Sequence, residues 1–184
     1  MKRLIYGAAP VVIVFFLSAC AGPRVISGFG ELRDGEGNPR SAPHSGVDVW
    51  GNPGDPVLAG ASGRVVVAAD EPSGLSYATC GKYLVLEHDV ANVLIAPRTT
   101  YCHLSTASVK VDDLVKRGDH IGTVGTTGWR RSPIGTTGFE HVHWELRTER
   151  GRVDPLSITE GCLDPKRAYP TERLALTYPV RCKN

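Results

Sequence analysis

Turn-forming residues divide this chain into short segments along almost its whole length, which limits the folds that it can adopt. The sequence has 21 glycines and 13 prolines, and they cluster between runs rich in β-branched and aromatic residues. No segment carries an apolar stripe of helical period longer than two turns. Many short strands separated by turn residues predict an all-β fold, with an antiparallel sheet and short loops. The expected strands lie at 57–58, 63–68, 83–87, 99–104, 120–124 and 139–146.

The first 19 residues have the layout of an export signal. A short basic start precedes a mostly apolar stretch that is too short for a comfortable transmembrane helix. Residues 17–20, Leu-Ser-Ala-Cys, resemble the bacterial lipobox, in which the cysteine is diacylated and becomes the first mature residue. We therefore expect 1–19 to be a lipoprotein signal peptide, Cys20 to carry the anchor and 20–27 to form a tether. An ordinary signal peptide with a chance cysteine is the alternative.

The charge balance argues against a nucleic-acid partner. The formal net charge is +2, and removal of 1–19 takes away Lys2 and Arg3 but no acidic residue, so 19 basic residues remain against 19 acidic ones. A net charge near zero does not support binding to a polyanion. The mature length suits one domain with a real core.

Four cysteines remain after the lipobox, an even number that indicates disulfides in an exported chain. No CxxC pair occurs, so a structural zinc site is not expected. Of the three possible pairings we favour Cys162 with Cys182, both in a mostly irregular C-terminal extension at 157–184. Cys80 and Cys102 flank a candidate hairpin and are the natural remaining pair.

Two histidines stand two residues apart in the strand expected at 139–146. Successive strand side chains point to opposite faces, so His141 and His143 project from the same face. They could form a metal-ligand pair, or one ligand and one proton-transfer group. An isolated pair of this kind is more often a half-exposed strand that happens to carry two histidines. The functional interpretation therefore depends on further partners, and the chain supplies them at His44, Asp48 and His103.

An imidazole and a carboxylate lie four residues apart at His44 and Asp48. Pro43, Gly46 and the β-branched neighbours argue against a helix here, and on a strand the even spacing places both side chains on one face. With one strand histidine they make three N/O ligands and leave a fourth position for water, as in catalytic zinc sites. Two imidazoles favour Zn²⁺ over Mg²⁺ or Ca²⁺. The HExxH signature is absent.

The order His44-x-x-x-Asp48, then Tyr101-x-His103, then His141-x-His143 resembles the lysostaphin/LytM-type zinc metallopeptidases, which are peptidoglycan endopeptidases with a β-sheet fold. Stretches at 26–30, 54–59, 63–66, 118–125 and 127–128 match as well. The resemblance covers roughly 25–156 and implies a domain at 28–156. It implies that His44, Asp48 and His143 ligate zinc. It also implies that His103 and His141 act on the proton and the developing oxyanion, without showing which does which.

The leading functional hypothesis is an exported, lipid-anchored zinc endopeptidase that hydrolyses peptide bonds of peptidoglycan. The resemblance also suggests the periplasmic face of the outer membrane, because Ala21 replaces the Asp that favours inner-membrane retention. The alternative is a non-catalytic LytM-like lipoprotein that binds murein or activates another cell-wall hydrolase. Such relatives typically lose metal ligands, whereas this chain keeps them all. A purely structural envelope lipoprotein is a third class, disfavoured for the same reason. Peptidoglycan and, through the lipid anchor, the membrane are the expected partners, and possible protein partners in the envelope are unknown.

Three secondary expectations follow from the strand assignments. In a strand at 99–104, His103 faces away from Cys102, so a Cys102 disulfide would lie behind the site. His88 and His120 fall outside the constellation and are expected at the surface or in a hairpin. A loop at 127–138 with Trp129-Arg130-Arg131 could contact a stem peptide, or equally be an ordinary solvated loop.

Overall fold

The computed structural model describes residues 21–70, 80–91, 93–128 and 140–182. The expected signal peptide, Cys20 and the Trp129-Arg130-Arg131 segment lie outside these ranges. Within them, no helix is both long and apolar enough to cross a bilayer.

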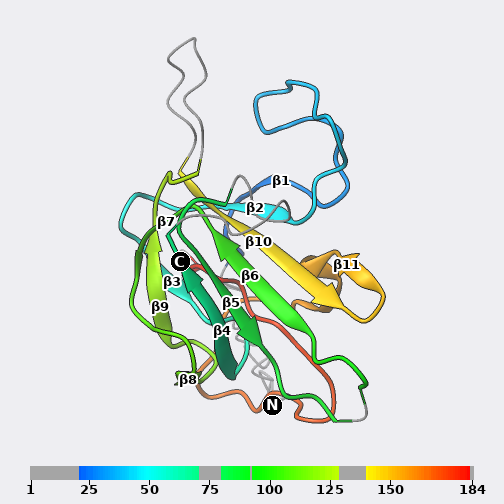
Figure 1. Cartoon of the computed structure of the whole chain (residues 1–184), viewed down its shortest axis with the longest axis vertical. Helices are drawn as coiled ribbons and strands as arrows, with labels where there is room; N and C mark the ends of the chain where they lie inside the picture. The colour runs from blue at the N-terminus through cyan, green and yellow to red at the C-terminus, as the bar shows by residue number, and fades with distance from the viewer. Residues whose placement is uncertain (1–20, 71–79, 92, 129–139, 183–184) are drawn as a thin grey trace, which may run out of the picture.

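Two antiparallel sheets make up the fold (Figure 1). The described ranges contain a single helical element, the 3-10 helix η2 (Pro155–Ile158). The prediction of an all-β antiparallel fold is therefore confirmed. The large sheet has the order β1 (Val25–Ser27), β2 (Val47–Trp50), β10 (His141–Thr148), β6 (Arg98–Cys102), β5 (Tyr83–Glu87), β4 (Gly63–Ala69), β8 (Leu114–Val115), with β11 (Gly151–Val153) paired to β10, and the small sheet has the order β3 (Pro56–Leu58), β9 (His120–Val124), β7 (Leu104–Ala107).

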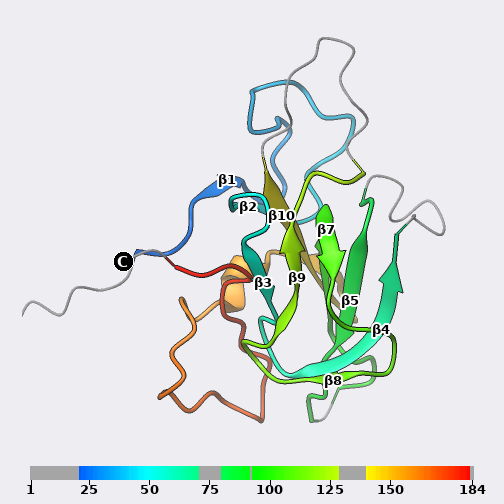
Figure 2. The ribbon, with the colours of Figure 1, turned by 90° about the vertical axis from the view of Figure 1, so that its left-hand side faces the viewer.

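The hydrophobic core lies between the two sheets (Figure 2). Trp144 and Tyr101 are opposite each other on β10 and β6 and are fully buried, and Ile121 and Val124 meet them from the small sheet. Replacing a buried aromatic residue by alanine typically costs about 3–5 kcal/mol. This core fixes which face of β10 points inward and therefore which face is left for polar residues.

The opposite face of the large sheet carries the predicted site residues. Residues directly opposite in an antiparallel pair share a face, and His143 lies opposite Asp48 on one side and Cys102 on the other. The expectation that Cys102 lies behind the site is therefore wrong. The alternation breaks at His103, which stands between β6 and β7 with a φ of 65°.

The two remaining histidines lie outside the cluster, as expected, one at the surface and the other in the hairpin between β5 and β6. His120 is exposed on β9, whereas His88 is 1% exposed. The His88 Nδ1 lies 2.9 Å from the Ser62 carbonyl oxygen and its Nε2 lies 2.8 Å from the Thr99 hydroxyl. Because both ring nitrogens have hydrogen-bond partners inside the protein, burial leaves neither of them unsatisfied. The position of His88 just after a strand gave no sign of these partners in the sequence.

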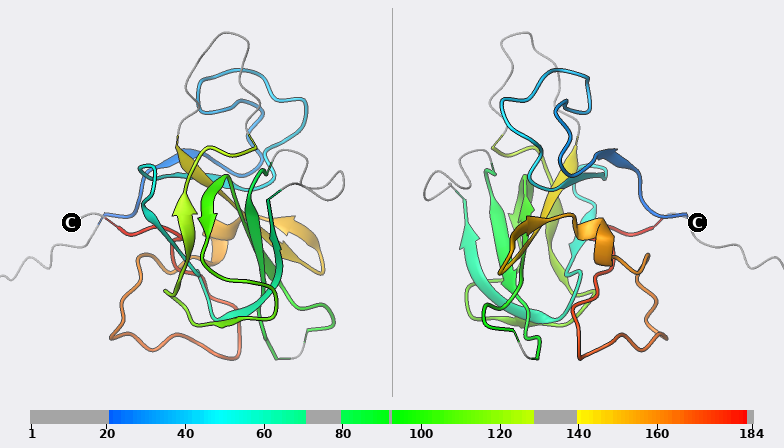
Figure 3. Two further views of the ribbon diagram at one scale, coloured as in Figure 1. Left: turned by 60° about the vertical axis from the view of Figure 1, so that its left-hand side comes forward. Right: turned by 90° about the vertical axis from the view of Figure 1, so that its right-hand side faces the viewer.

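The segment after η2 runs along the outside of the sheets (Figure 3). Its Leu176 and Val180 enter the core, and a disulfide joins Cys162 to Cys182 with a Cα–Cα distance of 5.9 Å. Arg117 also holds the segment, because its guanidinium lies 4.1 Å from the Tyr169 ring centroid and donates a 2.7 Å hydrogen bond to the Ala175 carbonyl.

Candidate metal centre

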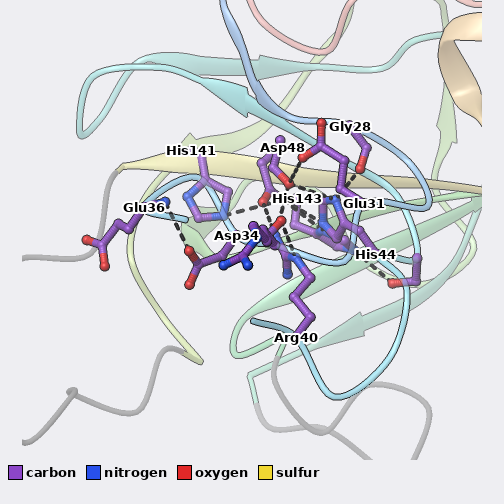
Figure 4. Close-up of polar contacts among 12 residues, drawn as sticks. Gly28, Glu31, Asp34, Glu36, Arg40, His44, Asp48, His141 and His143 are labelled. Atoms are coloured by element: carbon purple, nitrogen blue, oxygen red, sulfur yellow. Dashed lines mark hydrogen bonds and ion pairs between the residues drawn. The ribbon is translucent and has the colours of Figure 1, made fainter. Parts of the chain in front are cut away.

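Three of the predicted residues meet at one point on the polar face of the large sheet (Figure 4). Asp48 on β2 and His143 on β10 are register partners, and His44 precedes β2 by three residues. The ligand atoms that the three residues can offer all lie within 4.8 Å of one another. Asp48 Oδ1 is 2.8 Å from His143 Nδ1 and 3.1 Å from His44 Nε2.

The outer ring nitrogens show which atoms of the two histidines can bind a metal. His44 Nδ1 lies 2.9 Å from the Gly28 carbonyl oxygen, which can only accept, so Nδ1 carries the proton and Nε2 directs its lone pair inward. His143 Nε2 lies 3.2 Å from Glu145 Oε1, which leaves Nδ1 on the inner side. Two imidazole nitrogens and one carboxylate oxygen, all turned to the same point, fit Zn²⁺.

The negative charge of Asp48 and the positive charge of His143 stabilise each other. Burial disfavours ionised Asp48, but the hydrogen bond from His143 and the charges of His143 and His141 hold the pKa of that carboxyl well below its usual range. Burial also acts to lower the pKa of His143, yet its hydrogen bonds to Asp48 and Glu145 raise that pKa to about 9. A metal binds only deprotonated ligand atoms, so it competes with a proton for the place between these side chains.

His103 and His141 stand beside the three-residue cluster. His141 is 3% exposed, and its Nε2 is 3.6 Å from Asp48 Oδ1. The ring centroids of His103 and His141 are 4.9 Å apart. His103 Nδ1 lies 2.8 Å from the Thr127 carbonyl oxygen, so Nδ1 is the protonated nitrogen and Nε2 carries the lone pair. Burial, with the charges of His141 and His143, lowers the pKa of His103 to about 3.

The backbone of His103 is held by several segments at once. A φ of 65° is in the left-handed region, which costs of the order of 1–3 kcal/mol for such a residue and is frequent at functional sites. The His103 N–H donates to the Cys80 carbonyl at 2.8 Å, and Cys80 is bonded to Cys102. Residues 127–128 pass so close to position 81 that it must be glycine, because a Cβ on Gly81 would lie 2.2 Å from the Gly128 nitrogen.

Sequence reasoning missed polar residues that touch the cluster, among them Arg40, Ser45 and Glu145. Arg40 lies 3.4 Å from Asp48 Oδ2, and nothing in the sequence marked it out. Glu145 accepts from the Ser45 hydroxyl at 2.5 Å as well as contacting His143. The signal for Glu145 was present, because a residue two places after His143 on a strand must share its face.

This arrangement agrees with a match to the model of peptidase family M23 over residues 42–155. The chain belongs to peptidase family M23. It is 34% identical over 133 residues to the peptidoglycan DD-endopeptidase ShyB of Vibrio cholerae (72% of this chain, 27% of that protein). It is 29% identical over 133 residues to the murein hydrolase activator NlpD of Escherichia coli (72% and 28%). The chain thus spans about a quarter of the length of these M23 relatives.

Solved structures confirm the resemblance to lysostaphin-type enzymes and the fold. The catalytic domain of lysostaphin from Staphylococcus simulans superposes with a TM-score of 0.56 at 29% identity, covering 73% of this chain and 90% of that domain. A zinc-containing peptidase from Vibrio cholerae gives a TM-score of 0.53 at 29% identity, covering 72% and 35%. The M23 domain therefore accounts for most of the described chain.

Proposed function

We propose that this chain is a zinc-dependent endopeptidase that hydrolyses peptide bonds in peptidoglycan. The observation that carries the proposal is the inward orientation of three ligand atoms from His44, Asp48 and His143, with two further histidines beside them. Membership of the M23 peptidase family supports hydrolysis of peptide bonds. The similarity to a peptidoglycan DD-endopeptidase supports murein as the substrate.

Each residue has a role in this proposal. A bound zinc ion would supply Lewis-acid activation of a water molecule and of the scissile carbonyl. His103 Nδ1 is held by the Thr127 carbonyl and its Nε2 carries the lone pair, so His103 is suited to accept a proton from the attacking water and to return it to the leaving amine. His141 lies between His103 and Asp48 and is suited to stabilise the developing oxyanion.

The relative NlpD, named as a murein hydrolase activator, makes activation of another enzyme the second candidate function. The two candidates differ in their need for the metal-binding residues. A purely activating protein would work through its surface, so selection would not hold three ligand atoms within 4.8 Å of one another. Retention of the cluster therefore favours catalysis.

Digestion of purified murein by the purified chain tests the proposal, with products identified by mass spectrometry. The zinc-loaded chain alone should release fragments cleaved at peptide bonds. Chelation should stop release, and added Zn²⁺ should restore it. If the chain releases nothing alone but accelerates an added cell-wall hydrolase, and chelation has no effect on that acceleration, the activator function is correct instead.

We propose in addition that the chain is held in the cell envelope by a lipid on Cys20, on the periplasmic face of the outer membrane. The support is the lipobox-like sequence at 17–20 followed by Ala21, together with relatives named for peptidoglycan and murein. Mass spectrometry of the N-terminal peptide should find acyl chains on Cys20, and Cys20→Ala should leave the membrane fraction. An unmodified Cys20 in the mature protein would refute the anchor.

A further inference from the structure

We infer that Glu145 is a positioning residue for the metal centre, which holds the His143 ring so that Nδ1 rather than Nε2 is offered to the metal. The inference rests on the proposed zinc site. It concerns a residue that belongs neither to the predicted ligands nor to the predicted catalytic histidines.

The strand itself brings Glu145 to the outer edge of the His143 ring. The two residues are two places apart on β10 and share a face, and the Glu145 side chain is 8% exposed. Glu145 Oε1 lies 3.2 Å from His143 Nε2. An ionised carboxylate can only accept, so Nε2 must be the donor. The proton that a metal displaces is therefore the one on Nδ1, the atom that faces Asp48 at 2.8 Å.

Without this carboxylate, the inner contacts would not fix the ring. Asp48 Oδ1 can accept a hydrogen bond from a protonated Nδ1, and this alternative tautomer would place a proton where the metal has to bind. A partner on the outer nitrogen keeps the remaining proton on Nε2 when the metal displaces the proton on Nδ1. Partners of this kind orient metal-bound histidines in many proteins, and their loss typically weakens metal binding about 10–100-fold.

Glu145 is itself held from two directions. The Ser45 hydroxyl donates to Oε1 at 2.5 Å, and Arg152 Nε on β11 donates to Oε2 at 3.1 Å. Ser45 directly follows the ligand His44, so one carboxylate connects the loop of the first ligand to the strand of the third. The loop passes so close to β10 that a Cβ on Gly46 would lie 2.4 Å from the Trp144 carbonyl oxygen and 3.0 Å from Glu145 Cγ.

Zinc affinity of the purified chain, measured by competition with a chromophoric chelator, tests the inference. We expect Glu145→Ala to bind Zn²⁺ about 10–100-fold more weakly than the parent, and Glu145→Gln, which keeps an acceptor oxygen, to recover most of this loss. Glu87→Ala is the matched control, because Glu87 also stands on a strand of the large sheet and pairs with an arginine, Arg98, but does so at the surface. Its zinc affinity should equal that of the parent.

A second readout separates positioning from a merely structural role. In the zinc-loaded parent, NMR should show a slowly exchanging His143 Nε2–H, and this signal should be lost in Glu145→Ala. If Glu145→Ala does not fold, Glu145→Asp keeps the charge but withdraws the acceptor and should show the same weakening. A folded variant of either kind with parental zinc affinity and the Nε2–H signal intact would overturn the inference. A parent that binds no zinc would instead overturn the proposed function.

Discussion

The candidate metal-binding cluster and the turn that carries His103 are built in different ways, although the rings of His103 and His143 have centroids only 5.9 Å apart. Asp48 and His143 are register partners in the middle of a sheet whose other face is the hydrophobic core. His103 has a left-handed backbone between two strands that belong to different sheets. A disulfide, a carbonyl and a glycine hold it there.

This difference teaches that the sheet sets the positions of two proposed ligands, Asp48 and His143, whereas local restraints set the position of the proposed proton-transfer group His103. Shifting Asp48 relative to His143 would require a register slip that turns core residues towards solvent. Shifting His103 requires only that its turn relax from a strained conformation. Changes to Asp48 or His143 should therefore abolish metal binding, while changes to the turn that carries His103 should reduce the rate and spare the metal.

The largest effect on activity is expected from the ligands. Alanine at Asp48 or His143 removes one of the three ligand atoms, and the two that remain cannot hold the metal tightly. Each variant should therefore lose both zinc and murein hydrolysis. Zinc per chain, measured by elemental analysis alongside murein digestion, checks this. Full metal occupancy in Asp48→Ala would contradict the site.

Next in size is the effect of removing His103 or His141. Loss of a proton-transfer or oxyanion group typically lowers the rate about 10²–10⁴-fold. His103→Ala and His141→Ala should do so while keeping zinc and fold, as judged by metal content and circular dichroism. A metal-free His141→Ala protein beside a zinc-containing His143→Ala protein would mean that the two roles are reversed.

A smaller loss of activity is expected from opening the disulfide beside His103. Replacing both Cys80 and Cys102 by alanine should retain zinc but let His103 move, and a displacement of about 1 Å can cost up to about 10²-fold in rate. The matched control replaces Cys162 and Cys182. The two bridges span similar separations, 22 and 20 residues, so each loss should lower the free energy of unfolding by about 3 kcal/mol.

The control should show no rate loss when assayed well below its melting temperature. Equal losses of rate in the two double variants would indicate that the Cys80–Cys102 bridge stabilises the fold without positioning His103.

The smallest effect on activity, none, is expected from His88, which is buried away from the cluster. Burial lowers its pKa to about 4, against about 6.5 in an unfolded chain. Between these pH values the unfolded state binds more protons than the folded state. The free energy of unfolding is therefore unaffected by His88 above about pH 6.5 and falls as the pH drops towards 4, by on the order of 3 kcal/mol in all. His88→Gln should flatten this part of a stability profile from denaturant titrations; an unchanged profile would exclude His88 as its source.

The sequence predicted the residues on regular strands better than the turn that carries His103. Alternation along β10 placed His141 and His143 on one face, and the turn residues indicated the all-β class, because both depend on period-two geometry alone. The alternation assumed through His103 failed, since a positive φ in a non-glycine residue leaves no mark in composition. The burial of His88 was missed because its partners, Ser62 and Thr99, lie 26 and 11 residues away in the chain.

A crystal structure of the zinc-loaded chain is the most direct test of the central claim that His44, Asp48 and His143 bind the metal while His103 and His141 stand beside it. The account expects one zinc ion bound by His44 Nε2, Asp48 Oδ1 and His143 Nδ1, with His103 and His141 outside the coordination sphere and a position open to solvent. Coordination by His103 or His141 in place of any of these three atoms would contradict it.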